Sequence, residues 1–301
     1  MKKFFLSALL IFTVCVVGCA QQKTSSDVNQ IPTEVATPEN SSQEQSVPQA
    51  QPDKDYILAA DDLSNLQLDD PTKPVYDKYI LWERQEKNLP SVLPKLVPYD
   101  AKSVAYLTFD DGPDDKITPQ ILDILKAENV KATFYVCGNM VETYPDVLKR
   151  IFNEGHAIGN HSYNHRYDQI YASPWAFMEQ IIQTDNAIKN VIGVRPFIIR
   201  APGGVGMFNG DYWSMIDSCG YVEHDWNALT EDATPAKPNA SQQVNNVLKY
   251  LGDKPPRSVI ILMHSNSDKV ETVKALPEII HFLRDWGYTF GVVTPMTPQP
   301  W

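Results

Sequence analysis

The sequence predicts an α/β fold built on a mostly parallel sheet or barrel, because apolar runs of strand length alternate with helical stretches from residue 104 onwards. A hydrophobic content of 43% over 301 residues is sufficient for a well-packed core. The expected strands are residues 104–109, 132–136, 197–200, 221–226, 259–263 and 289–293, with a shorter one at 157–160. The expected helices are residues 118–128, 145–154, 174–192, 210–218, 240–251 and 271–286.

Residues 1–19 are expected to be a lipoprotein signal peptide. A basic start at Lys2-Lys3 precedes the apolar residues 4–18, a stretch too short for a comfortable membrane span. Cys19 and the small residues before it resemble a bacterial lipobox, in which the cysteine is lipidated. A plain signal peptide or an uncleaved anchor is the alternative. We therefore expect an exported protein, lipid-anchored through Cys19 to the outer face of a bacterial membrane and facing the cell envelope.

Three further segments follow the signal. Residues 20–55 are rich in Ser, Thr, Gln, Glu, Pro and Asn with almost no aromatic residues, which predicts a disordered linker. Residues 56–96 have a mixed composition and an expected helix near residues 75–87; they form either a packed N-terminal extension or a partner-binding arm. Residues 97–301 are expected to form the catalytic domain.

The formal net charge of −11 disfavours nucleic acid as a partner, because binding a polyanion requires basic patches. No feature of the sequence identifies a protein partner. Beyond the signal, Cys137 and Cys219 lack the paired spacing of a cysteine-rich metal site. Export would permit a disulfide between them, but we expect two reduced, structural cysteines.

An acid pair and a histidine pair predict a hydrolytic metal site. Asp110 and Asp111 directly follow the first expected strand, and His161 and His165 come about fifty residues later. One carboxylate and two imidazoles can bind a zinc-like ion and leave a position for water, while the second carboxylate takes a proton. The spacing alone leaves open which aspartate is the ligand and which is the base or a turn residue. The pattern indicates a metal-dependent hydrolase.

Other polar residues also follow expected strands, where the reactive groups of parallel α/β folds gather. Together these segments resemble, in order, the five motifs of the NodB-like polysaccharide deacetylases, carbohydrate esterase family 4, over about residues 97 to 295. The motifs are Thr108-Phe109-Asp110-Asp111-Gly112, His161-Ser162-Tyr163-Asn164-His165, Arg200-Ala201-Pro202-Gly203-Gly204, Asp225-Trp226 and Leu262-Met263-His264-Ser265. The resemblance implies a distorted (β/α) barrel of the NodB-homology type with about seven parallel strands, and removal of acetyl groups from polymeric sugars.

The resemblance also implies a role for each site residue. Asp110 would be the general base, and Asp111, His161 and His165 would bind one divalent metal, with zinc expected first and cobalt, manganese or nickel as alternatives. The backbone N–H of Gly203 would face the oxyanion. Here the sequence departs from the commoner Arg-Pro-Pro-Tyr-Gly pattern, and the missing ring is expected to open one wall of the groove.

The remaining residues are expected to support this chemistry. Arg200 would pair with Asp110 and keep it ionised. His264 would protonate the leaving amine, and Asp225 would hydrogen-bond His264 and hold it as imidazolium. Trp226 and Leu262 would line the pocket for the acetyl methyl group.

The substrate expected first is N-acetylglucosamine of peptidoglycan, because a tethered surface lipoprotein faces the cell wall. Chitin oligomers, an exopolysaccharide and acetylated xylan are alternatives within the same chemistry. A lipoprotein that only binds glycan, with an inactive site, is an alternative of a different class.

Overall fold

A computed structural model describes residues 55–64, 66 and 70–300 of the chain. The predicted signal peptide, Cys19 and the predicted linker as far as residue 54 lie outside the described residues. Among the residues that are described, no helix combines the length and apolar character needed to span a bilayer. Cys137 and Cys219 are both free.

The main sheet has eight strands, and all its recorded pairings are parallel. Its continuous order is β8 (Val222–Glu223), β7 (Ile198–Ile199), β5 (Ala157–Asn160), β4 (Thr133–Val136), β3 (Val104–Asp110), β10 (Ser258–His264) and β9 (Ala228–Leu229). The eighth strand, β11 (Thr289–Gly291), pairs with the first half of β3. Every residue of β3 is buried, which explains why the strand is mostly apolar before it ends at Asp110.

The two edges of this sheet lie near one another. The chain leaves β8 at one edge and enters β9 at the other through residues 224–227 alone, and each residue spans at most ~3.6 Å. The sheet therefore curls, and Tyr106, Tyr135, Ile198 and Ile260 pack together in one buried cluster. This confirms the predicted distorted (β/α) barrel, with seven strands on the continuous path.

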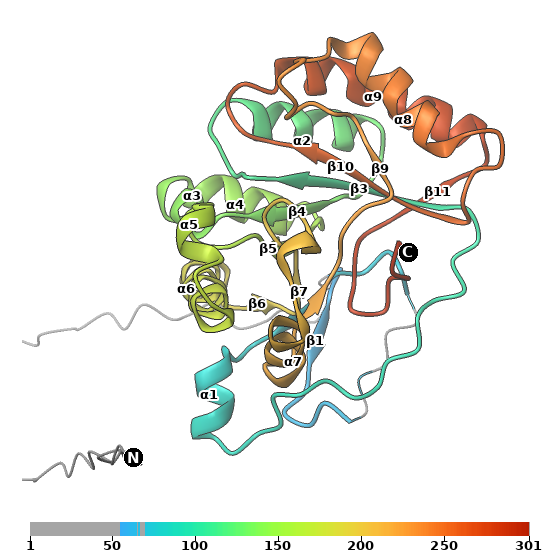
Figure 1. The fold of residues 1–301 in the computed structure, drawn as a ribbon. Helices are drawn as coiled ribbons and strands as arrows, with labels where there is room; N and C mark the ends of the chain where they lie inside the picture. The colour runs from blue at the N-terminus through green and yellow to red at the C-terminus, as the bar shows by residue number, and fades with distance from the viewer. Residues whose placement is uncertain (1–54, 65, 67–69, 301) are drawn as a thin grey trace, which may run out of the picture. The chain divides into compact units, whose positions relative to one another are not determined.

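Helices surround the sheet, and their mutual contacts follow the order α8, α9, α2, α4, α6 and α7 (Figure 1). Their bounds are α2 (Ile117–Ala127), α4 (Pro145–Asn153), α6 (Pro174–Ile192), α7 (Gly210–Ser218), α8 (Ala240–Leu251) and α9 (Val270–Asp285). Shorter elements are α3 (Gly138–Thr143), α5 (Tyr167–Ile170) and the 3-10 helix at Val205–Met207. The longest helix, α6, starts at Pro174 after the capping side chain of Ser173 and ends at Gly193, whose φ is 80°.

The N-terminal extension packs against the catalytic domain through a second, three-stranded sheet. This sheet contains β1 (Ile57–Ala59), β2 (Val75–Asp77) and β6 (Arg195–Pro196). The predicted helix at residues 75–87 is therefore wrong at its start, and only α1 (Leu81–Glu86) is helical there. Val75 and Tyr76 are buried in β2, and the buried Asp77 pairs with both Arg84 and Arg195. These long-range contacts override the local helical pattern.

Candidate metal centre and active site

The predicted site residues gather at the carboxyl edge of the main sheet. Asp110 ends β3 and lies directly opposite His264, which ends β10. His161 follows β5, and Arg200 follows β7. This arrangement is the one expected when parallel strands place their carboxyl ends at the same edge.

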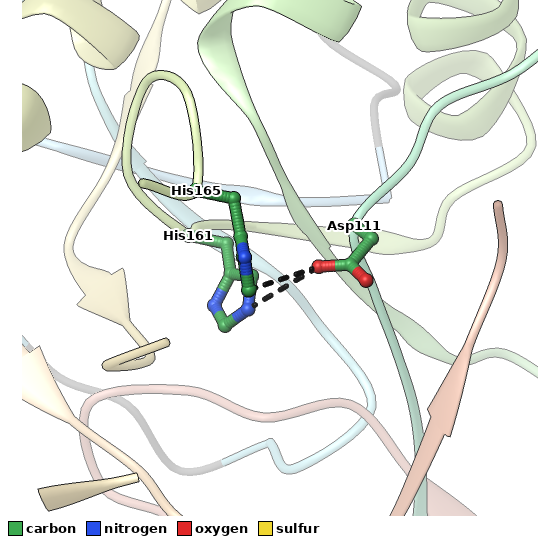
Figure 2. Close-up of side chains that lie close together, drawn as sticks. All are labelled: Asp111, His161 and His165. Carbon is green, nitrogen blue, oxygen red and sulfur yellow. Dashed lines mark ion pairs between the residues drawn. The ribbon is translucent and has the colours of Figure 1, made fainter. Parts of the chain in front are cut away.

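The side chains of Asp111, His161 and His165 come together at this edge (Figure 2), and one ligand atom from each lies within 4.8 Å of the others. The Oδ1 atom of Asp111 is 3.3 Å from Nε2 of His165 and 3.6 Å from Nε2 of His161. This oxygen is buried without a hydrogen-bond partner among the described residues, whereas Oδ2 accepts a hydrogen bond from Asn266. An orphaned carboxylate oxygen beside two imidazole nitrogens fits a divalent cation.

The surroundings of His161 fix the tautomer and the charge that a metal ligand needs. Its Nδ1 lies 2.9 Å from the backbone oxygen of Arg200, so the proton resides on Nδ1 and leaves the Nε2 lone pair facing Asp111. Burial lowers the pKa of His161 to about 3, with the charge of Asp111 opposing that shift. The ring is therefore neutral, as a metal ligand must be.

The histidine pair lies in a tight turn and not on a helix, because α5 begins only at Tyr167. Ser162 and His165 have φ values of 79° and 55°, in the left-handed region that non-glycine residues seldom adopt. The Ser162 N–H donates to Asn160, and the His165 N–H donates to the Ser162 hydroxyl. These bonds hold a strained backbone that turns both rings to the same side.

The predicted ion pair between Asp110 and Arg200 is present. Arg200 Nη1 donates to Asp110 Oδ1 at 2.9 Å and to Thr108 Oγ1 at 2.7 Å. Burial raises the pKa of the Asp110 carboxyl, and the charge of Arg200 opposes this shift. Asp110 is held mainly by the guanidinium, whereas Asp111 contacts both imidazoles. This geometry favours Asp111 as the metal ligand and Asp110 as the base.

The predicted hydrogen bond between Asp225 and His264 is wrong. Nδ1 of His264 lies 2.7 Å from Asp232 Oδ1, while the other oxygen of Asp232 accepts from the His264 N–H and the Thr272 hydroxyl. Burial disfavours the charged form of His264, but Asp232, with smaller contributions from Asp110 and Asp111, opposes that effect, and the pKa of His264 is raised. Asp225 instead accepts a hydrogen bond from the backbone N–H of Val205.

The physical reason is strand pairing. Ala228 on β9 pairs with Ile261 on β10, so the chain after β9 runs to the end of β10, where Asp232 meets His264. Asp225 lies before β9, in the segment that crosses between the sheet edges. A two-residue strand gives no readable apolar run, and the only signal for Asp232 is the acid pair Glu231-Asp232 that follows Ala228-Leu229-Thr230.

The substrate-facing residues have suitable positions, and their roles stay predictions. The N–H of Gly203 has no hydrogen-bond acceptor among the described residues. Trp226 packs against the buried cluster that contains Tyr106 and Tyr135, and the centre of its indole ring is 5.7 Å from the guanidinium carbon of Arg200. Leu262 is buried on β10, two residues before His264 and on the same face of the strand.

Replacing Asp232 with asparagine is expected to move the alkaline limb of the pH–rate profile towards lower pH. As the expected acid, His264 would act only while protonated, so activity would fall as pH rises through its pKa, and Asp232 is the main group that raises that pKa. Asp110 and Asp111 also raise the pKa of His264, so the alkaline limb is expected to move to lower pH while activity is retained below it. The measurement is kcat/KM against pH, with Asp268→Asn, an exposed carboxylate of the neighbouring loop, as the control. An unchanged profile in the Asp232 variant would contradict this role.

Comparison with known proteins identifies the family of the chain. Residues 98–224 match the family model of the polysaccharide deacetylases. A peptidoglycan-N-acetylglucosamine deacetylase of Bacillus cereus is 37% identical over 205 residues, which are 66% of this chain and 70% of the relative. The chain belongs to the polysaccharide deacetylase family.

Other relatives of this polysaccharide deacetylase agree with it in fold or in sequence. A solved CE4 esterase of Streptococcus mutans superposes with a TM-score of 0.61 at 30% identity, covering 69% of this chain and 94% of the esterase. A bifunctional xylanase/deacetylase of Pseudobutyrivibrio xylanivorans is 36% identical over 194 residues, 63% of this chain and 30% of the relative. In this deacetylase Asp111, His161 and His165 could hold the metal on which such hydrolysis depends.

Proposed function

We propose that this deacetylase removes N-acetyl groups from N-acetylglucosamine residues of peptidoglycan. The observation that carries the proposal is the arrangement of a base and an acid around one candidate metal centre. Asp110, paired with Arg200, lies beside His161, and His264 lies at the end of the adjacent strand. The peptidoglycan deacetylase relative at 37% identity supports the choice of substrate.

The residues of the chain divide the reaction between them. A divalent ion on Asp111, His161 and His165 would supply a Lewis acid for the acetyl carbonyl and for water. Asp110 takes a proton from the attacking water, and Arg200 keeps its carboxylate in place. The N–H of Gly203 donates to the oxyanion, and His264, charged through Asp232, gives a proton to the departing amine nitrogen.

Zinc is the metal we propose, because one carboxylate and two neutral imidazoles form a common catalytic zinc set. Cobalt, manganese and nickel fit the same ligands, so metal supply would decide the occupant. We further propose that a lipid at Cys19 anchors the protein to the outer face of the membrane, with residues 20–55 as the tether. The sequence features described above support this location.

The test is acetate release from purified peptidoglycan, measured with and without a chelator and after zinc is restored. We expect release that the chelator stops and that zinc recovers. Defined chitin oligomers, an exopolysaccharide and acetylated xylan form parallel arms; the xylanase/deacetylase relative makes xylan the strongest competitor. If acetate is released from acetylated xylan alone, the substrate is xylan and not peptidoglycan. No release from any acetylated glycan with metal restored would favour a protein that only binds glycan.

A further inference from the structure

The space beside Gly203 is filled by a side chain from another segment. A Cβ atom built on Gly203 would lie 2.6 Å from Oη and 3.0 Å from Cε1 of Tyr167. Tyr167 is the first residue of α5 and comes two residues after His165. The expectation that the missing ring opens this wall of the groove is therefore wrong. The ring is supplied from α5 instead.

The Tyr167 ring has rigid support on its inner side. It meets the His165 ring edge to face, with centroids 5.4 Å apart, and lies 5.8 Å from the Tyr171 ring. Tyr171 in turn donates a hydrogen bond of 2.6 Å to the backbone oxygen of Pro202, the residue before Gly203. This bond ties α5 to the loop that carries the proposed oxyanion donor, so Tyr167 and Gly203 are held in a fixed relation.

The outer side of the ring is open, because Tyr167 is 50% exposed. Single exposed aromatic rings are common on protein surfaces, so it is the position of Tyr167, and not its exposure alone, that carries the inference. The faces of pyranose rings carry C–H groups that pack well on aromatic rings, and the phenol needs few rotamers to be held in place. Because Tyr167 lies beside both the candidate metal centre and Gly203, the sugar that it would contact is the one that carries the reacting acetyl group.

We propose that Tyr167 is a substrate-binding residue that packs its ring against the pyranose of the acetylated sugar, replacing the aromatic residue that Gly203 lacks. The inference deepens the proposed function and rests on it. Because the contact is made by the ring, phenylalanine at this position should serve as well as tyrosine, whereas alanine should not. The contact is made with the sugar ring and not with the amide bond that breaks, so it contributes to binding of the substrate more than to the chemical step.

The first experiment measures glycan binding without turnover. The Asp110→Asn protein, loaded with zinc, is titrated with an N-acetylglucosamine oligomer in a calorimeter, and Tyr167→Ala and Tyr167→Phe are each added to that background. We expect alanine to weaken binding about tenfold and phenylalanine to change it little. Trp286→Ala and Tyr250→Phe remove comparable exposed groups elsewhere and should leave binding unchanged.

The second experiment separates KM from kcat on the same oligomer and measures zinc per chain. In Tyr167→Ala we expect KM to rise about tenfold, with kcat nearly unchanged and one zinc retained. Tight binding in the alanine variant, or a fall in zinc content that explains the loss, would overturn the proposal. If the protein never releases acetate but its glycan binding depends on Tyr167, the proposed function is wrong and the proposed contact is still supported.

Discussion

Asparagine in place of Asp110 is expected to lower kcat by about 10²- to 10⁴-fold, the usual contribution of a general base, while zinc stays bound at one equivalent. The carboxylate of Asp110 is buried, held by Arg200 and aimed at the candidate metal centre, so its amide analogue keeps the shape and loses the ability to accept a proton. Acetate release at saturating substrate and zinc content per chain are the two measurements.

Two further variants make this result specific. Asp115→Asn changes an exposed carboxylate a few residues along the chain and should leave kcat unchanged. Asp111→Asn should show the reverse of Asp110→Asn, because it loses zinc first and activity as a consequence. If Asp110→Asn loses its zinc while Asp111→Asn retains it, the two aspartates have exchanged roles, which is the alternative that the sequence left open.

Alanine in place of His165 is expected to weaken zinc binding by more than about 100-fold, beyond the usual cost of losing only a supporting partner of a metal ligand. Removal of the imidazole leaves only His161 and Asp111, and two ligands make a poor site for a divalent ion. Zinc affinity is measured with a competing chromophoric chelator, and activity should fall with zinc occupancy.

The control for this variant is His281→Ala. His281 is an exposed histidine on α9 that contacts Glu128 and is not one of the candidate metal ligands. Its zinc affinity should match that of the parent protein. A His165→Ala protein that still holds zinc at full stoichiometry and unchanged affinity would show that the ligand set is wrong. Excess zinc should partly restore activity to His165→Ala but not to Asp110→Asn, which separates loss of the metal from loss of the base.

The parts of the fold that the sequence predicts well are those with long, fully buried runs. β3 and β10 are each seven residues long and apolar through almost their whole length, so their ends locate Asp110 and His264 without further information. The two-residue β9 has no such signal. Its register against β10 is set by tertiary contacts, and this is why the partner of His264 was expected to be Asp225 when it is Asp232.

Two other differences have the same origin in long-range packing. Val75 and Tyr76 follow a helix-compatible pattern, yet pairing with Ile57 and Leu58 on one side, and of Tyr76 with Pro196 on the other, makes them a strand. The Tyr167 ring lies over Gly203 although the two residues are far apart in sequence and nothing local links them. Spacing and residue type predict which groups reach the sheet edge, but only the packed structure determines which neighbour each one meets.

Arg200 also binds the short segment, residues 224–227, that connects β8 to β9. Besides holding Asp110, its guanidinium donates to the backbone oxygens of His224 and Asp225, at 2.8 and 3.1 Å, within the segment that bridges the two open borders of the barrel. One side chain therefore connects the two edges of the barrel and holds Asp110, the proposed base. Closure of the barrel and placement of the proposed base thus depend on the same residue.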